Sequence, residues 1–183
     1  ADAGNYALTS TSASTTANIT AATLTPTVTA ASKTYDGTAA TTATCAISTG
    51  VISPDVVSCT TGTASFDSKQ VGTGKTVTLS GLTLSGADAG NYTLASTTAT
   101  TTAAITAATL TPTVTAASKT YDGTAATIAQ VAGVISPDVV SCTTATASFD
   151  SKLVGTGKTV TVSGLTLSGA DAGNYTLASA TAM

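Results

Sequence analysis

"SKTYDGTAAT" runs from Ser32 to Thr41, and the same ten letters return from Ser118 to Thr127. Two further strings, "VISPDVVSCTT" and "SGADAGNYTLAS", also occur twice in the same order. The offset between copies is 86 residues at the first string and 83 at the other two, because the second copy is shorter between them. Repetition at this period predicts tandem copies of one small domain.

The repeats divide the chain into three parts. The opening letters "ADAGNYALTS" match the end of a copy, so residues 1–20 are interpreted as the C-terminal part of a preceding repeat. Residues 21–106 form repeat 1, and residues 107–183 form repeat 2, which lacks the Thr-rich closing strand of repeat 1. Two explanations stay open. The chain is a stretch of a longer array, or repeat 2 accepts a strand from another copy and so builds a filament.

Apolar residues alternate with Thr and Ser in both repeats, as in "KTVTVSGLTLSG" from Lys158 to Gly169. Such runs, bounded by Gly, Asp, Asn and Pro, predict an all-β fold with five to seven short strands in each repeat. We expect turns at "YDGT", "ISPD", "GTGK" and "GADAGN". The pattern favours a β-grasp-like sheet or an immunoglobulin-like sandwich, with the repeats in a rod-like array, and does not decide between the two.

Two prolines and a short linker mark the boundary between repeats. Pro26 and Pro112 occur in corresponding strands, and proline has no N–H for a ladder. Each should therefore lie at an edge or where no ladder bond is needed. We expect at most three linker residues, so that neighbouring domains are held in line.

Charge is sparse: 8% of residues are charged, the net charge is −3, and every charged residue is Lys or Asp. So few cations argue against nucleic acid and anionic membranes as partners. Because His, Glu and Arg are absent, a Ser or Thr nucleophile would need a Lys base, and no Ser-x-x-Lys spacing occurs. No apolar run approaches the roughly 20 residues of a membrane span. We therefore expect no enzyme, no cofactor and no membrane span in these residues.

The Tyr-Asp-Gly motif has a physical role in folding. In Tyr35-Asp36-Gly37 and Tyr121-Asp122-Gly123, the Asp side chain can bond the backbone while Gly takes a positive φ. We expect the Tyr ring to pack and its hydroxyl to face water.

A second turn motif ends each copy, with Asn91-Tyr92 in repeat 1 and Asn174-Tyr175 in repeat 2. The oxygens of "SGADAGNY" would also suit Ca²⁺, but a full shell needs about six to eight oxygens and the loops hold too few acids. A turn without metal is the preferred interpretation.

The three cysteines are Cys45, Cys59 and Cys142. Cys59 and Cys142 are equivalent, whereas Cys45 lies where the copies differ. A Cys45–Cys59 disulfide would close a loop of 14 residues and contribute about 3 kcal/mol in the chain-entropy picture. Cys142 would then be left as a buried thiol or as one that bonds another chain.

With these strings the chain resembles the YDG-type repeats of large bacterial surface adhesins and haemagglutinin-like proteins, which are related to β-grasp-like MBG modules. Tyr35-Asp36-Gly37, Tyr121-Asp122-Gly123 and the two "AGNYTLA" runs carry the resemblance, which covers essentially the whole chain. It implies an extracellular, tandemly repeated, mostly β module without enzymatic activity. The cysteines depart from the usual pattern, so the resemblance does not bear on them.

These observations predict a structural repeat of a bacterial extracellular or cell-surface protein, which forms an adhesin stalk or a filament shaft. Its partners would be neighbouring repeats of the same chain. The alternative is a binding module in which each repeat recognises a glycan, a protein or ice. Seven aromatic residues across the chain argue against glycan, while flat ranks of Thr would suit ice only if they matched across strands.

Overall fold

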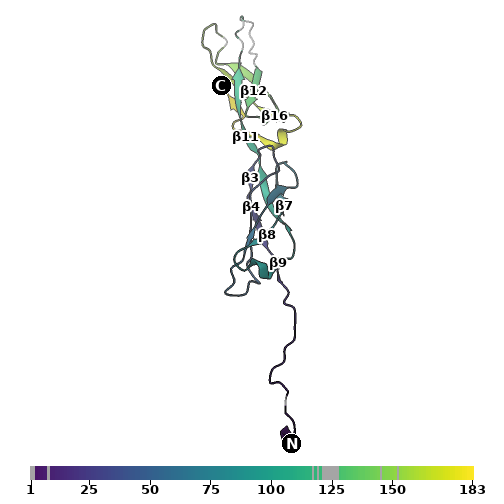
Figure 1. Cartoon of the computed structure of the whole chain (residues 1–183). Coiled ribbons are helices and arrows are strands. Elements are labelled where there is room, and N and C mark those ends of the chain that lie inside the picture. The colour runs from purple at the N-terminus through teal and green to yellow at the C-terminus, as the bar shows by residue number, and fades with distance from the viewer. Residues whose placement is uncertain are drawn as a thin grey trace.

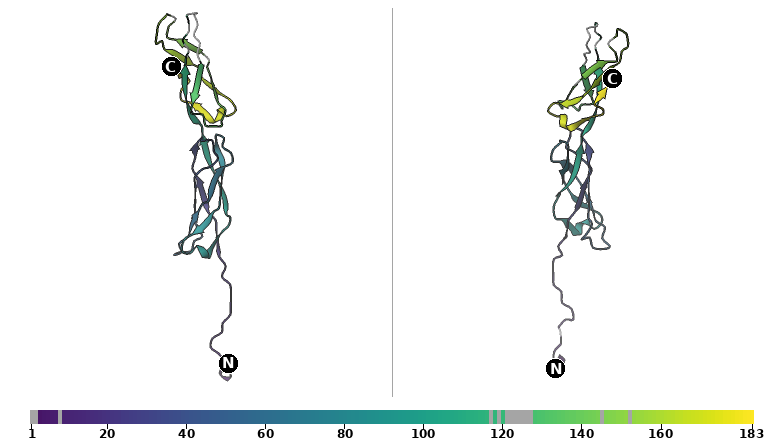
Figure 2. Two further views of the ribbon diagram at one scale, coloured as in Figure 1. Left: turned by 45° about the horizontal axis from the view of Figure 1, so that its top comes forward. Right: turned by 180° about the vertical axis from the view of Figure 1, so that it is seen from behind.

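The computed structural model describes residues 3–7, 9–116, 118, 120, 128–144, 146–151 and 153–183. Two elongated β-domains stand end to end, and residues 9–20 extend from the first without regular secondary structure (Figures 1 and 2). The helices in these residues are 3-10 helices of three residues each, which agrees with the predicted all-β fold. None of the described helices is long and apolar enough to cross a membrane.

In the described residues, each repeat consists of β-strands, most of them short, and one 3-10 helix. Repeat 1 contains β1 (Ala22–Leu24), β2 (Thr27–Ala30), β3 (Lys33–Thr34), β4 (Ala43–Ala46), β5 (Ser58–Thr60), β6 (Thr63–Phe66), β7 (Gly72–Ser80), β8 (Thr83–Ser85), η2 (Ala89–Asn91), β9 (Tyr92–Leu94) and β10 (Thr98–Thr106). Repeat 2 contains β11 (Ala108–Thr115), β12 (Ile128–Ala132), β13 (Ser141–Thr143), β14 (Thr146–Phe149), β15 (Val160–Ser163), β16 (Thr166–Ser168), η3 (Ala172–Asn174), β17 (Tyr175–Leu177) and β18 (Thr181–Ala182). The N-terminal segment holds η1 (Ala3–Asn5).

The largest sheet is in repeat 1 and has the order β3-β10-β7-β6. Its long strands β10 and β7 are antiparallel, and β3 joins β10 in parallel. The other pairs of repeat 1 are β1-β9, β2-β4 and β5-β8. Repeat 2 forms the sheets β12-β11-β17, β14-β15-β18 and β13-β16.

The prolines lie where a strand changes partners. Pro26 separates β1, which pairs with β9, from β2, which pairs with β4. In repeat 2, β11 pairs with β17 up to Leu110 and with β12 from Thr111 onward, so Pro112 lies beside the change. Repeat 1 has ten strands, more than the five to seven predicted, and the division of one alternating stretch into β1 and β2 accounts for one of the additional strands.

The predicted turn at "GTGK" is wrong in repeat 1, where these residues begin strand β7. Gly72 pairs with Ile105 and Lys75 pairs with Ala103, so two intervening residues on β7 face one on β10. This is a β-bulge, and Gly74 supplies the left-handed conformation with φ of 61°. Positive φ at a glycine therefore marks a bulge here rather than a chain reversal.

The main core lies inside repeat 1 and continues into repeat 2. Val77 and Leu79 on β7 and Ile105 on β10 are at most 1% exposed. Leu110 and Tyr175, both from repeat 2, belong to the same buried cluster. A second, smaller cluster in repeat 2 consists of Val160, Val162 and Leu165. The two domains thus share apolar packing at their boundary.

The predicted Cys45–Cys59 disulfide is confirmed, with 5.6 Å between the Cα atoms. It joins β4 to β5 and so ties two two-stranded sheets together. Cys142 on β13 is a free, half-buried thiol, and burial raises its pKa. A raised pKa lowers the fraction of reactive thiolate. A bond from Cys142 to another chain stays a prediction.

We predict that Ala129→Cys closes a second disulfide with Cys142. Ala129 pairs with Val114 as Cys45 pairs with Val28, so Ala129 lies where repeat 1 has Cys45. Cys142 occupies the position of Cys59, because the pair β13-β16 corresponds to the pair β5-β8. Titration of thiols in the unfolded, unreduced chain should then find none, compared with one in the wild type. The new bond should stabilise repeat 2 by about 3 kcal/mol. Two persistent free thiols would contradict the equivalence of the repeats at this position.

Candidate functional site at the joint between the repeats

The boundary between the repeats is where residues singled out from the sequence converge. β10 ends at Thr106 and β11 begins at Ala108, so one residue, Ala107, connects the domains. Each domain presents loops to the other across this linker (Figure 2). We call the contact between these loops the joint.

Repeat 1 contributes the Tyr-Asp-Gly turn, which β3 and β10 hold in place. The backbone N–H of Tyr35 donates to the Thr106 carbonyl at 2.8 Å. Asp36 Oδ1 accepts the N–H of Thr38 at 2.9 Å, and Gly37 has a φ of 79°. The local geometry is therefore the one expected for an Asp-Gly turn.

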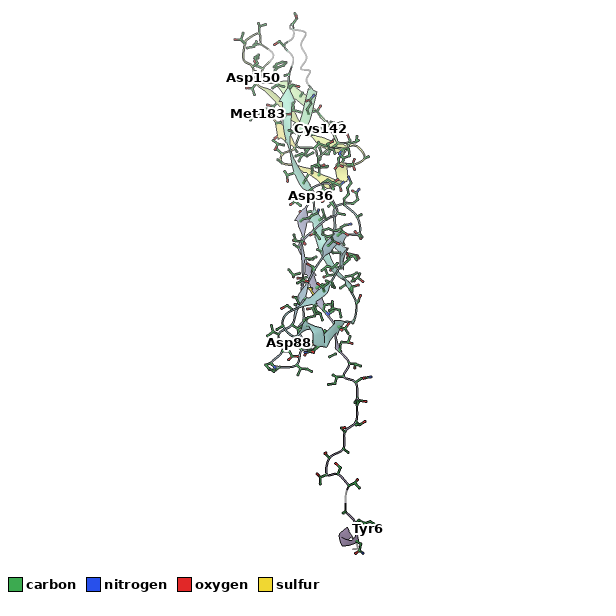
Figure 3. All side chains as sticks on the ribbon, viewed as in Figure 1. Tyr6, Asp36, Asp88, Cys142, Asp150 and Met183 are labelled. Atoms are coloured by element: carbon green, nitrogen blue, oxygen red, sulfur yellow. A yellow bond between two sulfur atoms is a disulfide. The ribbon has the colours of Figure 1, made fainter. Side chains whose placement is uncertain are left out.

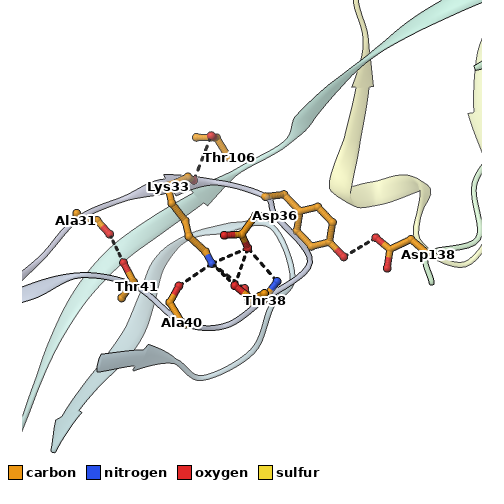
Figure 4. Close-up of polar contacts among 9 residues, drawn as sticks. Ala31, Lys33, Asp36, Thr38, Ala40, Thr41, Thr106 and Asp138 are labelled. Carbon is orange, nitrogen blue, oxygen red and sulfur yellow. Dashed lines mark hydrogen bonds and ion pairs between the residues drawn. The ribbon is translucent and has the colours of Figure 1, made fainter. Parts of the chain in front are cut away.

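Lys33 fixes the turn from inside. Its ammonium donates to Asp36 Oδ1 and to the Ala40 carbonyl, both at 2.7 Å, and to the Thr38 carbonyl at 2.9 Å (Figure 4). These bonds hold the pKa of Asp36 at about 2, with Lys33 as the main cause. The turn is thus a preformed surface at the end of repeat 1.

The Tyr35 hydroxyl does not face water, contrary to the prediction. It donates to Asp138 Oδ2 of repeat 2 at 2.6 Å, and the Tyr35 residue is only 3% exposed (Figure 4). Tyr175 of repeat 2 donates to the same oxygen at 2.8 Å. Lys69, in the loop between β6 and β7, forms an ion pair with Asp138 Oδ1 at 2.9 Å. One carboxylate therefore receives bonds from both repeats.

Further contacts surround this carboxylate. The rings of Tyr35 and Tyr175 meet edge to face with centroids 5.4 Å apart, and Lys69 Nζ lies 5.9 Å from the Tyr35 ring centroid. Such ring contacts add stabilisation beyond burial alone. The N–H of Val71 donates to Asn174 Oδ1 at 3.1 Å, and Asn174 is 2% exposed. The joint thus combines a charge pair, two rings and a buried amide.

The charges at the joint stabilise each other. The Tyr35 hydroxyl and, next, the Lys69 ammonium hold the pKa of Asp138 at about 2. Asp138 in turn raises the pKa of Lys69. Burial is the main cause that raises the pKa of Tyr35 and of Tyr175. At neutral pH the cluster therefore holds one ionised carboxylate, one ammonium and two neutral phenols.

We predict that acid weakens the joint. The pKa of Asp138 is about 2 in the joint and about 3.8 without its partners. A lowered pKa gives a stabilisation that is complete above pH 3.8 and is lost as the pH falls toward 2. NMR relaxation should show the two domains tumbling more independently at pH 2 than at pH 5. Because Asp36 titrates in the same range, Asp138→Asn serves as the control, and its joint should respond less to pH. Equal tumbling of the wild type at both pH values would contradict this assignment.

The second turn motif lies next to the joint in repeat 2. Asn174 and Tyr175 both contact repeat 1, as described above. In repeat 1, Asn91 and Tyr92 occupy the corresponding turn at the opposite end, where Asp88 is labelled in Figure 3. The Asp88 carboxylate accepts the Val56 N–H at 2.8 Å, so it forms a hydrogen bond with the backbone of a neighbouring loop. Among the described residues no group of three or more His, Cys, Asp or Glu could hold a metal ion. Tyr121, Asp122 and Gly123 lie outside the described residues.

Sequence reasoning missed Asp138 and Lys69. Both lie far from Tyr35 in the chain, so no local pattern joins them. The available signal was the scarcity of charged residues in the sequence. The chain has nine acids, and the Asp of "ISPD" recurs unchanged as Asp55 and Asp138. Because the other acids of repeat 1 recur as well, at Asp122, Asp150 and Asp171, this signal alone does not single out Asp138.

The comparisons with known proteins agree with the repeat structure. A family model described as the YDG domain matches residues 20–102 and again residues 106–182. No curated protein and no solved structure matches the chain. The joint therefore lies between two copies of one recognised domain.

Proposed function

This chain belongs to the YDG-domain family, and from that premise we propose that it is a non-catalytic structural repeat of a bacterial extracellular or cell-surface protein. In this role, tandem copies form the stalk of an adhesin or the shaft of an extracellular filament. The observation that carries the proposal is the joint, in which the Asp138 carboxylate is bonded by residues of both repeats. A domain boundary of this kind transmits orientation from one copy to the next.

Three features support a stiff joint. One residue links the domains, which leaves little room for a hinge. The buried cluster of repeat 1 includes Leu110 and Tyr175 of repeat 2, so bending would expose apolar surface. The Asp138 side chain is 2% exposed, so separation of the domains would also break its bonds. Stacked copies with such joints form a quasi-one-dimensional array.

The test is the length of arrays that contain increasing numbers of this repeat, measured by electron microscopy. A stiff stalk should lengthen in proportion to the number of repeats. A flexible string of domains should lengthen only with the square root of that number. Square-root growth, or compact particles, would overturn the stalk proposal.

The binding alternative has one observation in its favour. The exposed hydroxyls of β6, β7 and β10 lie in matched ranks, since Thr100 pairs with Thr78 and Thr78 pairs with Ser65. The next rank joins Thr98, Ser80 and Thr63, whereas Thr76 pairs with Thr102 alone. A regular hydroxyl array is the feature we expected of an ice-binding face. An assay of ice recrystallisation with wild type and Thr78→Tyr tests it, and identical results for both would reject this alternative.

Glycan recognition is less well supported. The aromatic rings that would stack on a sugar are mostly inside, because Tyr35, Phe66, Tyr92 and Tyr175 are each at most 7% exposed. Among the described residues, Tyr6 is the exposed exception at 84%. A single ring on the N-terminal segment makes a poor sugar site.

Strand exchange between copies is a second assembly route that we propose for a filament. Ile19 corresponds to Ile105 at the 86-residue offset, but it is fully exposed, whereas Ile105 is buried on β10. In repeat 1, β10 pairs with β7, and β15 is the strand of repeat 2 that corresponds to β7. A segment such as 12–20 from another copy, which corresponds to β10, has the sequence of a partner for β15. Ile19→Asp should abolish filaments that form by this route.

A further inference from the structure

In the joint, residues of repeat 2 contact the end of repeat 1 that carries the Tyr-Asp-Gly turn. Residues of the same types recur in repeat 1, at its end away from the joint. In repeat 2 they are Ile135, Asp138, Asn174 and Tyr175, and at the 83-residue offset they correspond to Ile52, Asp55, Asn91 and Tyr92. We call the set Ile52, Asp55, Asn91 and Tyr92 the acceptor surface of repeat 1. It lies at the end of repeat 1 where Asp88 is labelled, away from the joint (Figure 3).

The acceptor surface has the same internal geometry as its counterpart in the joint. Tyr92 donates to Asp55 Oδ2 at 2.7 Å, compared with 2.8 Å from Tyr175 to Asp138. The Ile52 N–H donates to the Tyr92 hydroxyl at 3.0 Å, compared with 3.1 Å for the matching bond in repeat 2. The carboxylate and the tyrosine hydroxyl are therefore arranged before any partner arrives, which lowers the entropic cost of binding.

Exposure is what distinguishes the two ends. Asn174 is 2% exposed in the joint, whereas Asn91 is exposed. Ile135 is half-buried, and a Cβ placed on Gly37 would lie 3.1 Å from its Cγ2, whereas Ile52 is 65% exposed. The nearby valine provides a control, because Val56 and Val139 are both 60% exposed and so lie outside the contact.

The surface that repeat 1 contributes to the joint also has an exposed counterpart. Val71 is half-buried where its N–H meets Asn174, but Val154, which corresponds to it in repeat 2, is 90% exposed. The string "SKTYDGTAAT" around Tyr35 is identical around Tyr121. Tyr121 lies outside the described residues, so its assignment here follows from sequence identity alone.

We propose that the acceptor surface of repeat 1 binds the Tyr-Asp-Gly end of a second copy of this repeat. In the bound state a Tyr hydroxyl and a Lys ammonium bond Asp55, a backbone N–H bonds the Asn91 side chain, and Ile52 is covered. The chemistry follows from the joint, in which the same groups meet. The inference rests on the proposed structural function and deepens it, because it names the groups by which repeat 1 would hold a further copy of the repeat. Copies of the chain would then associate head to tail.

The experiment is sedimentation velocity of the full chain from about 10 μM to about 1 mM, a range chosen because a linker supplies an effective concentration of about millimolar. The wild type should form elongated dimers and longer species as its concentration rises. Ile52→Arg should weaken this association by about tenfold or more, because it places a charge in the contact. Val56→Arg, at a similarly exposed position outside the contact, should associate like the wild type.

A mixing experiment identifies the two surfaces. Tyr121→Ala alone should also fail to associate, whereas a mixture of Ile52→Arg and Tyr121→Ala should form one-to-one dimers, since each variant keeps one intact surface. Circular dichroism checks that each variant is folded. A wild type that stays monomeric at about 1 mM would overturn the proposal. So would an equal loss of association in Val56→Arg, or a mixture that does not dimerise. The stalk proposal would be unaffected by these results, because array length tests it separately.

Discussion

Replacement of Ile105 with alanine is expected to lower the free energy of unfolding of repeat 1 by about 2 to 5 kcal/mol. Ile105 is 1% exposed and lies on β10, the central strand that pairs with both β3 and β7. Truncation leaves a cavity in the buried cluster to which Ile105 belongs, in a core that has few large side chains to fill it. Urea denaturation followed by circular dichroism measures the loss.

Ile19→Ala is the matched control for this substitution. Ile19 holds the corresponding place in the preceding copy of the sequence and is fully exposed. The control should change the free energy of unfolding by no more than about 0.5 kcal/mol. If both substitutions destabilised the protein equally, residues 9–20 would be packed in solution and the account of the N-terminal segment would be wrong.

Asp138→Ala is expected to open the joint while both domains stay folded. The substitution leaves the Lys69 ammonium without its carboxylate and the hydroxyls of Tyr35 and Tyr175 without their acceptor. The Val71 amide, bonded to Asn174 across the joint, reports on opening. Its hydrogen exchange should accelerate on the order of tenfold or more, whereas amides in the centre of β7 keep their protection.

Asp55→Ala supplies the comparison for the joint. Asp55 accepts the hydroxyl of Tyr92 as Asp138 accepts that of Tyr175, but it lies at the far end of repeat 1. Exchange at Val71 should therefore remain at the wild-type rate in Asp55→Ala. Accelerated exchange at Val71 in both variants would mean that the loss of a turn carboxylate destabilises the whole repeat, and that the effect is not specific to the joint.

Much of the fold was predictable because it depends on local patterns. Alternation of Val and Leu with Thr indicated strands, and the turn at Asp36-Gly37 has the geometry expected of that pair. The Cys45–Cys59 disulfide followed from the short loop between the two residues. These features are set within about fifteen residues, where propensity and spacing suffice.

The joint was not predictable in the same way. Tyr35 and Asp138 are 103 residues apart, and the contact depends on how two folded domains stack. The prediction that the Tyr35 hydroxyl faces water failed because the tyrosine was considered within one repeat. The predicted turn at "GTGK" was wrong for a related reason. A positive φ at Gly74 suits both a turn and a bulge. Only the pairing of β7 with β10 distinguishes the two.

The most direct test of the central claim is the distance distribution across the joint, measured by double electron–electron resonance. Spin labels at Thr78→Cys and Thr161→Cys, exposed and corresponding positions on β7 and β15, span the two repeats in a Cys142→Ala chain that keeps the Cys45–Cys59 bond. We predict one narrow distance population, which becomes broad when Tyr35 is replaced with alanine. A broad distribution in the chain that keeps Tyr35, or a narrow one that the replacement leaves unchanged, would contradict a joint held by the tyrosine and carboxylate cluster.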